Sequence, residues 1–161
     1  FTLIRHLFYD EFDYIRISAL LRSNNNELKS RAEKIILEED YHLKHFRVLL
    51  NRLVQKEEGI KVISQTLNKY LYDLFTLFEI NDKILNFYNS PLFPISYDEH
   101  FERFYETITK NFNFYKFPPK EEILNYVRNL KFSRNGNKSE VFMKFYNTFR
   151  EVFLIEPDAK W

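Results

Sequence analysis

The apolar positions between Glu27 and Val54 recur every three to four residues, which predicts one long amphipathic helix. At about 100° per residue they form a single stripe. Its members are Leu28, Ala32, Ile35, Ile36, Leu43, Phe46, Leu50 and Leu53. Glu39 falls in the middle of this stripe, and His42 lies one turn further along its edge. Because an uncompensated carboxylate on a buried face is strongly destabilising, Glu39 needs a partner.

A second amphipathic helix is predicted over residues 1–21, with Glu11 near the centre of its apolar face. The polar run 23–26 between the two helices is short, which predicts an antiparallel hairpin. In such a hairpin, any two residues that lie at the same height on the two helices have residue numbers that add up to the same value. The sum of 50 for Glu11 and Glu39 places the loop centre at Asn25. Two inward carboxylates are therefore expected at the same level.

This arrangement matches half of a carboxylate-bridged di-metal site. Two iron or manganese ions need hard oxygen ligands that bridge them, and an imidazole on each metal. A Glu-x-x-His pair on one helix supplies both types, and a facing helix adds the second carboxylate, as in ferritin-like bundles. We therefore predict Glu11, Glu39 and His42 as ligands of iron or manganese. The supporting side chains around them would be Asp10, Glu38 and Tyr41.

A metal-free alternative stays open, because a helical chain rich in Glu and Lys produces Glu-x-x-His by chance. In that interpretation Glu11 and Glu39 form a polar core. They would be neutralised by protonation, or by an Arg, Lys or Tyr side chain, with Lys34 as one candidate.

Composition indicates a single all-α domain over 1–161, because only 2 Gly and 5 Pro interrupt the 161 residues. The net charge of +1 gives no reason to expect nucleic acid or a membrane as partner. The absence of Cys excludes disulfides and thiolate metal sites. With neither a signal peptide nor a long apolar run in the sequence, we expect a cytoplasmic protein.

The remaining pattern predicts more helices and a few local features. The expected ranges are helices at 60–78, 81–88, 97–112, 120–130 and 139–154, and a turn at 134–137. Gly59 is interpreted as a helix break, and Ser96 with Glu99 as a capping box. We expect His100 to lie at the surface, and the aromatic residues of 139–154 to pack in the core.

Four segments, in order along nearly the whole chain, carry a resemblance to a known family. They are Phe8-Tyr9-Asp10, Lys34-x-x-x-Glu38-x-x-Tyr41-His42-Leu43-Lys44, Leu77-Phe78 followed by Glu79 and Asp82, and the ending Pro157-Asp158-Ala159-Lys160-Trp161. Together they resemble the phenylacetic acid catabolic protein family. Within it, the likeness is to the ferritin-like structural (C-type) subunit of bacterial ring-1,2-phenylacetyl-CoA epoxidase.

The resemblance implies a ferritin-like bundle in a multicomponent oxygenase with a di-iron catalytic subunit, a reductase and phenylacetyl-CoA as substrate. The C-type subunit pairs with its catalytic paralogue and is itself non-catalytic. The family commonly has small or apolar residues at the positions of Glu11 and Glu39, so this chain resembles a metal-competent relative. The family also has a further helical hairpin before the position of Phe1, which we expect to supply the rest of the site.

We therefore expect a subunit of a phenylacetyl-CoA epoxidase-like monooxygenase. Its partners would be a paralogous catalytic subunit or a second copy, a reductase, and an acyl-CoA bound by the partner. Two alternatives remain: a structural subunit without metal, and a generic ferritin-like protein that handles iron or peroxide.

Overall fold

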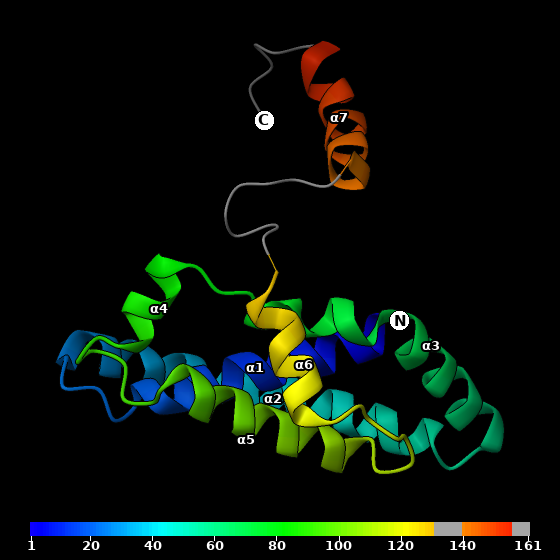
Figure 1. Ribbon diagram of the computed structural model, residues 1–161, viewed down its shortest axis with the longest axis horizontal. Coiled ribbons are helices and arrows are strands. Elements are labelled where there is room, and N and C mark those ends of the chain that lie inside the picture. The colour runs from blue at the N-terminus through cyan, green and yellow to red at the C-terminus, as the bar shows by residue number, and fades with distance from the viewer. Residues whose placement is uncertain (131–139, 156–161) are drawn as a thin grey trace.

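The structure is a computed structural model that describes residues 1–130 and 140–155. Both ranges are helical and contain no β-strand, which confirms the predicted all-α helical bundle (Figure 1). The elements are α1 Thr2–Leu20, α2 Asn26–Leu53, α3 Glu57–Phe75, the 3-10 helix η1 Thr76–Phe78, α4 Asp82–Tyr88, α5 Tyr97–Asn111, α6 Lys120–Arg128 and α7 Glu140–Ile155. The predicted turn at 134–137 and the segment 157–161 lie outside the described residues.

Helices α1 and α2 form the predicted hairpin (Figure 1). The side-chain oxygen of Asn25 accepts hydrogen bonds at 3.0 Å from the backbone N–H groups of Glu27 and Leu28, and so caps α2. Helix α1 packs against α2, α5 and α3. Eight of its 19 residues are buried, against three of the 28 in α2, so α1 is the central helix and α2 covers one side of it.

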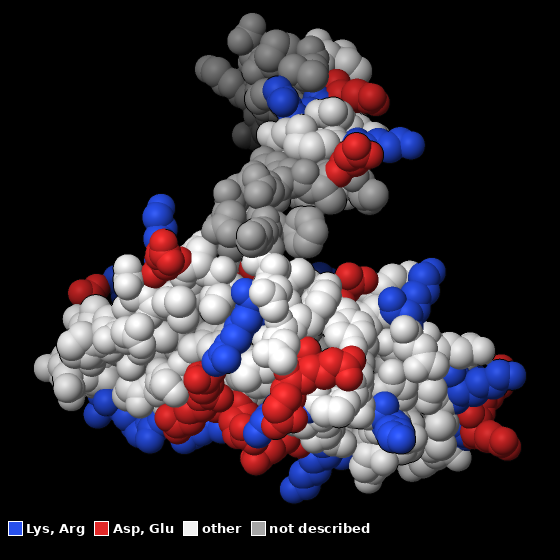
Figure 2. Space-filling model, in the orientation of Figure 1, with Lys and Arg blue, Asp and Glu red and all other residues white. Residues whose placement is uncertain are grey.

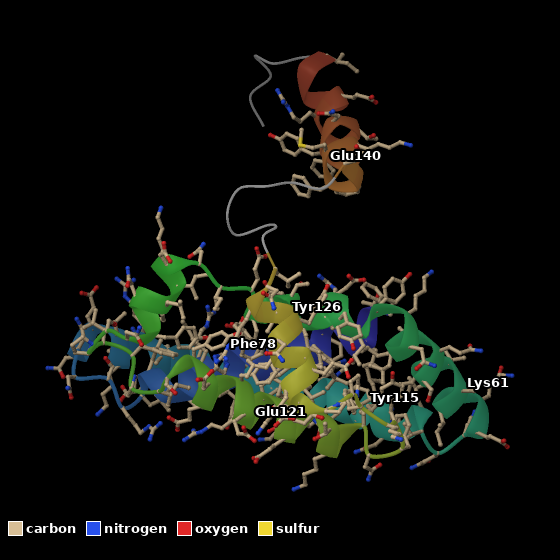
Figure 3. All side chains as sticks on the ribbon, viewed as in Figure 1. Lys61, Phe78, Tyr115, Glu121, Tyr126 and Glu140 are labelled. Atoms are coloured by element: carbon tan, nitrogen blue, oxygen red, sulfur yellow. The ribbon has the colours of Figure 1, made fainter. Side chains whose placement is uncertain are left out.

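Phenylalanine rings fill the core between α1, η1 and α5. Phe78 lies inside the bundle, where its ring meets Phe12 edge-on at 4.9 Å and Phe101 at 5.0 Å (Figure 3). Phe8 packs in the same way against Phe75 at 5.6 Å. Edge-to-face pairs add about 0.5 to 1.5 kcal/mol each beyond the burial of their area, so this ring cluster fixes how the helices cross.

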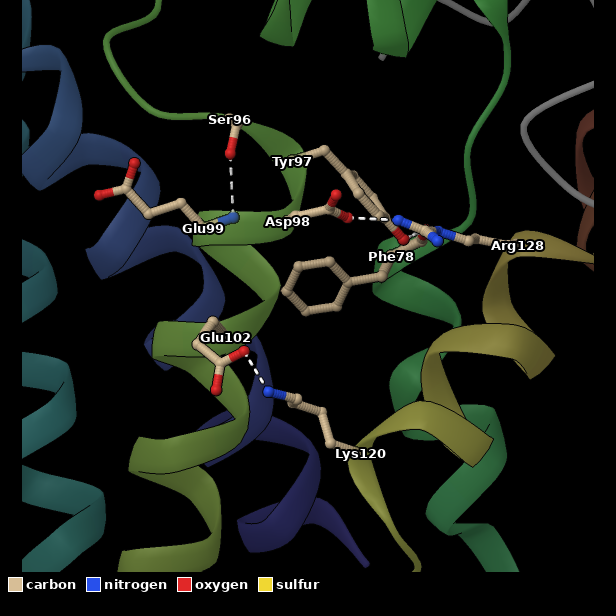
Figure 4. Close-up of polar contacts among 8 residues, drawn as sticks. All are labelled: Phe78, Ser96, Tyr97, Asp98, Glu99, Glu102, Lys120 and Arg128. Atoms are coloured by element: carbon tan, nitrogen blue, oxygen red, sulfur yellow. Dashed lines mark hydrogen bonds and ion pairs between the residues drawn. The ribbon is translucent and has the colours of Figure 1, made fainter.

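Helix α6 lies across α5 and is tied to it by ion pairs. These pairs, drawn in Figure 4, are Arg128 with Asp98 at 2.5 Å and Lys120 with Glu102. The Ser96 hydroxyl accepts the backbone N–H of Glu99 at 3.1 Å, which confirms the predicted N-cap of α5. Both pairs reach solvent, so they orient α6 more than they stabilise it.

Gly59 does not end a helix, contrary to the prediction. It is the third residue of α3, and the break between the helices comes earlier, after Leu53. A Cβ added at Gly59 would lie 2.0 Å from the carbonyl oxygen of Leu53. The glycine therefore permits close contact between the end of α2 and the first turn of α3.

The imidazole of His100 is fully buried, which corrects its predicted place at the surface. Its Nε2 donates to the carbonyl oxygen of Phe12 at 3.0 Å, and its Nδ1 accepts from the Tyr88 hydroxyl at 2.6 Å. Because a carbonyl can only accept, these contacts assign the proton to Nε2. One ring thus links α1, α4 and α5, and its burial lowers the pKa of His100 to about 4.

The aromatic side chains of α7 are exposed, so their predicted place in the core is wrong for the described residues. Phe145 is 67% exposed and Phe149 is 76% exposed. Figure 1 shows α7 apart from the other helices. The side chain of Phe153 is outside the described part of the chain. Helical spacing of aromatic residues predicts an apolar face but not what covers it.

The visible face of the bundle carries charged side chains of both signs, mostly along its lower part and right end, between broad areas of uncharged residues (Figure 2). This mixture agrees with the net charge of +1. Within the described residues, none of the helices combines the length and apolar character that a membrane span requires.

We predict that the protein loses stability as the pH falls from 6.5 to about 4, through His100. The pKa of His100 in the folded state is about 4, below the ordinary value of 6.5. Between these two pH values the imidazole is protonated in the unfolded chain but neutral in the folded one, so protonation favours unfolding. The stabilisation is complete above pH 6.5 and declines toward pH 4, by roughly 3 kcal/mol in all. Urea denaturation at several pH values measures this slope.

The variant His100→Gln should show a flatter slope over the same pH range. His45→Gln, which changes an exposed imidazole, is the control and should keep the slope of the wild type. Equal slopes in all three proteins would contradict the assignment to His100.

Candidate functional site

Glu11 lies on the inner face of α1, and its carboxylate is buried. The guanidinium of Arg47 on α2 donates to its Oε2 at 2.6 Å. Asn111 of α5 also faces this carboxylate, without the geometry of a full hydrogen bond. Burial raises the pKa of Glu11, and Arg47 offsets part of that effect. An Arg on the second helix therefore compensates Glu11, which is one form of the metal-free alternative.

The acids of α1 that act on Glu39 are Asp13 and Asp10 rather than Glu11. His6 stacks on Phe46 at 4.6 Å, and Asp13 acts on the carboxylate of Glu39. In the same way the imidazole of His42 acts on Asp10. The residue numbers in each of these three pairs add up to 52 rather than 50. The stack of His6 on Phe46 is a direct contact between the two helices of the hairpin.

Glu11 and Glu39 have different partners across the hairpin. Glu11 follows Asp10 by one residue, which turns its side chain by about 100° around α1. It therefore points toward Arg47 and α5, whereas Asp10 is directed toward His42.

Five side chains, which we call the hairpin cluster, lie together along α1 and α2. They are His6, Asp10, Asp13, Glu39 and His42. Burial raises the pKa of Asp10, and the imidazoles of His6 and His42 lower it only in part. The Oδ2 atom of Asp10 is buried and has no hydrogen-bond partner among the described residues. Burial also raises the pKa of Glu39, and the charges of Asp13 and Asp10 raise it further.

The two other predicted supporting residues point outward. Glu38 is exposed, with its carboxylate 3.8 Å from Nε2 of His42. Tyr41 is 68% exposed and stacks on His45 at 6.5 Å, on the outer side of α2. Of the predicted supporting set, Asp10 alone has a buried carboxylate oxygen without a hydrogen-bond partner among the described residues.

The predicted ligand set is brought together only in part. Glu39 and His42 lie in the hairpin cluster, but Glu11 is occupied by Arg47. Asp10, the residue before Glu11, has a buried carboxylate oxygen without a hydrogen-bond partner among the described residues. Within the described chain, no group of three or more His, Asp or Glu side chains is already arranged to hold a metal ion. Metal binding stays a prediction.

Sequence analysis missed His6 and Asp13 as members of this cluster. The signal was present, because His6, Asp10 and Asp13 follow one another at spacings of four and three residues. Such spacing puts them on one face of α1. That face borders the apolar stripe of α1 but is not part of it, so the period of the apolar residues does not point to it.

The molecule is an all-α protein with a carboxylate and imidazole cluster on its N-terminal hairpin. A comparison with protein-family models matches residues 1–115 to the phenylacetic acid catabolic protein family. The match covers well over half of the chain, and the chain belongs to this family. It therefore has a role in phenylacetate catabolism. A comparison with curated proteins found no significant match.

We predict that Arg47→Met destabilises the protein, because it leaves the buried carboxylate of Glu11 without its cation. Breaking a buried ion pair costs roughly 3 to 5 kcal/mol, and we expect about 2 kcal/mol here, since part of the pair reaches solvent. The Arg47 side chain is 40% exposed and that of Glu11 is 3% exposed. Chemical denaturation measures the free energy of unfolding.

Arg52→Met provides the control, because Arg52 is an exposed cation in the last turn of the same helix. Adding Glu11→Gln to Arg47→Met should restore part of the lost stability, which a double-mutant cycle quantifies. Identical losses for Arg47→Met and Arg52→Met would argue against a structural role for the ion pair.

Proposed function

We propose that this chain is a subunit of a multicomponent oxygenase of the phenylacetyl-CoA epoxidase type, and that its α1–α2 hairpin contributes half of a di-metal site. The ligands would be Asp10, Glu39 and His42, with Asp10 in place of Glu11. The observation that carries the proposal is the unpartnered Oδ2 of Asp10 beside a Glu-x-x-His pair. Both lie within the segment that matches the family.

The donor chemistry supports iron or manganese. Two carboxylates and one imidazole are the ligand types that these ions take in ferritin-like bundles. The acids lie close enough to raise the pKa of Glu39, and a bound cation would reverse that effect. The metal ions would supply the oxygen chemistry. The residues of this chain would orient the ions, and Arg47 would keep Glu11 out of the ligand set.

The family supports the proposed partners. A paralogous ferritin-like subunit would complete the assembly, a reductase would deliver electrons, and phenylacetyl-CoA or a related aromatic acyl-CoA would be the substrate. Residues 1–115 carry the family match, so contacts with these partners are expected first on α1 to α5.

A metal-free structural subunit, as in the C-type branch of the family, is the second candidate. The ion pair of Glu11 with Arg47 favours it, because this pair uses a predicted ligand for stability. Such a subunit would support its catalytic paralogue by packing alone, and the hairpin cluster would then be a cost to stability without a role in binding.

A Mn²⁺-binding experiment separates the two candidates. Binding is measured by the loss of the electron paramagnetic resonance signal of the free ion. We expect wild type to bind Mn²⁺. Asp10→Asn, Glu39→Gln and His42→Gln should each weaken binding by roughly tenfold or more, since each removes one ligand. Glu33→Gln is the matched control, because it changes an exposed carboxylate on the same helix. No binding by wild type would favour the structural subunit.

A tagged chain should also retain a larger ferritin-like paralogue on purification from cells that grow on phenylacetate. This outcome is expected for both candidates. Failure to retain it would contradict membership in an epoxidase-type assembly. The result of the Mn²⁺ experiment would then bear on metal binding alone.

A further inference from the structure

Helix α6 is too short to be stable as an isolated helix. It spans Lys120–Arg128, nine residues, and its N-cap residue Pro119 provides no side-chain hydrogen bond to the first turn. Isolated helices shorter than about 12 to 15 residues are marginal in water. The helical state of α6 therefore depends on its packing against the bundle, and a detached α6 would unfold.

The apolar contact that holds α6 in place is small. Of the eleven residues 120–130, three are buried, namely Ile123, Val127 and Leu130. The ring of Tyr126 adds an edge contact with Tyr72 of α3 at 4.8 Å. Burial of three side chains favours docking of α6, whereas the conformational entropy of the whole segment opposes it. The docked and detached states of α6 are therefore close in free energy, and weak interactions can decide between them.

Two ion pairs hold both ends of α6 against α5. Arg128 pairs with Asp98 at 2.5 Å at the end of α6, and Lys120 pairs with Glu102 at its start. Figure 4 shows these pairs on either side of the ring of Phe78. The four charged side chains are between 31% and 66% exposed, so salt screens both pairs. Each pair contributes little to overall stability, but a nearly balanced docking equilibrium responds to such small contributions.

Helix α6 covers an aromatic part of the core. It packs against α3 and η1, whose Phe75 and Phe78 are buried. Phe101 of α5 contacts both rings, at 6.1 Å from Phe75 and 5.0 Å from Phe78. We call these three side chains the covered rings. They lie within the residues that match the family, whereas α6 follows those residues, so a segment outside the match closes this part of the core.

We propose that α6 is a reversible strap over the covered rings, which its ion pairs with α5 keep closed and which opens more often as the ionic strength rises. In the open state α6 is detached and unfolded, α1 to α5 stay folded, and the covered rings are accessible to apolar molecules. A molecule that binds these rings would in turn favour the open state. The inference does not depend on the proposed metal site.

Hydrogen exchange of the full chain, followed by mass spectrometry of its peptides, tests the strap. We expect the amides of α6 to exchange at least roughly tenfold faster than those of α1, because they exchange through local opening. Raising the NaCl concentration from about 0.02 M to about 1 M should accelerate exchange in α6 by roughly fivefold, since screening weakens both ion pairs. Exchange in α1 should not respond to the salt.

The variant Glu102→Gln should accelerate exchange in α6 by roughly two- to fivefold and reduce its response to salt, because it removes one of the two ion pairs. The change lies on α5, so the helix propensity of α6 is untouched. Arg103→Gln is the matched control, because it removes an ion pair with Glu99 inside α5 and should leave exchange in α6 at the wild-type rate. Fluorescence of Nile red, an uncharged apolar dye, should rise in Glu102→Gln but not in Arg103→Gln.

Each contrary result would overturn a defined part of the proposal. Exchange in α6 that is as slow as in α1 would mean that α6 opens only when the whole protein unfolds, and would overturn the strap. Fast exchange in α6 that does not respond to salt would overturn the ion pairs as the contacts that keep it closed. Equal acceleration in Glu102→Gln and Arg103→Gln would indicate a general loss of stability and overturn them as well. Nile red fluorescence that does not follow exchange in α6 would overturn the accessibility of the covered rings.

Discussion

The buried carboxylate of Glu11 has to be compensated inside the bundle, and Arg47 does so from the neighbouring helix. The requirement acts on the register of the hairpin as well as on its stability. In the same packing the imidazole of His42 acts on the carboxylate of Asp10, and the carboxylate of Asp13 acts on that of Glu39. The inner ion pair and the outer hairpin cluster are thus two consequences of one helix packing. A change in either should be felt by the other.

The helices and their ends could be predicted from the sequence because local chemistry determines them. Asn25 and Ser96 cap α2 and α5 as their side chains dictate, and the apolar period gives α1 to α6. The structure places Glu11 beside Arg47 rather than beside Glu39. A loop of polar residues does not specify which of the neighbouring acids of α1 faces α2, so the sequence could not predict this pairing.

Three other differences have one cause, which is that burial depends on partners distant in the chain. His100 has a polar side chain, yet it is buried, because both ring nitrogens make hydrogen bonds, one with Phe12 and one with Tyr88. Gly59 is a residue type that commonly ends helices, but here it lies inside α3 and allows a close contact with the backbone of Leu53. The aromatic face of α7 follows the same spacing as a core helix, yet it is exposed. No local pattern distinguishes these cases.

The hairpin contains two kinds of acid, and the contrast between them bears on function. Glu11 has a cation within hydrogen-bonding distance, as expected where a charge is kept for structure. Asp10 and Glu39 have raised pKa values and are surrounded by imidazoles and by each other, and one oxygen of Asp10 is buried without a partner among the described residues. Selection for stability alone would favour an Arg or an apolar residue at these positions. Their cost to stability is explained if a cation that comes from outside the chain completes the cluster, which is why we propose a role in binding for Asp10 and Glu39 and a role in stability for Glu11.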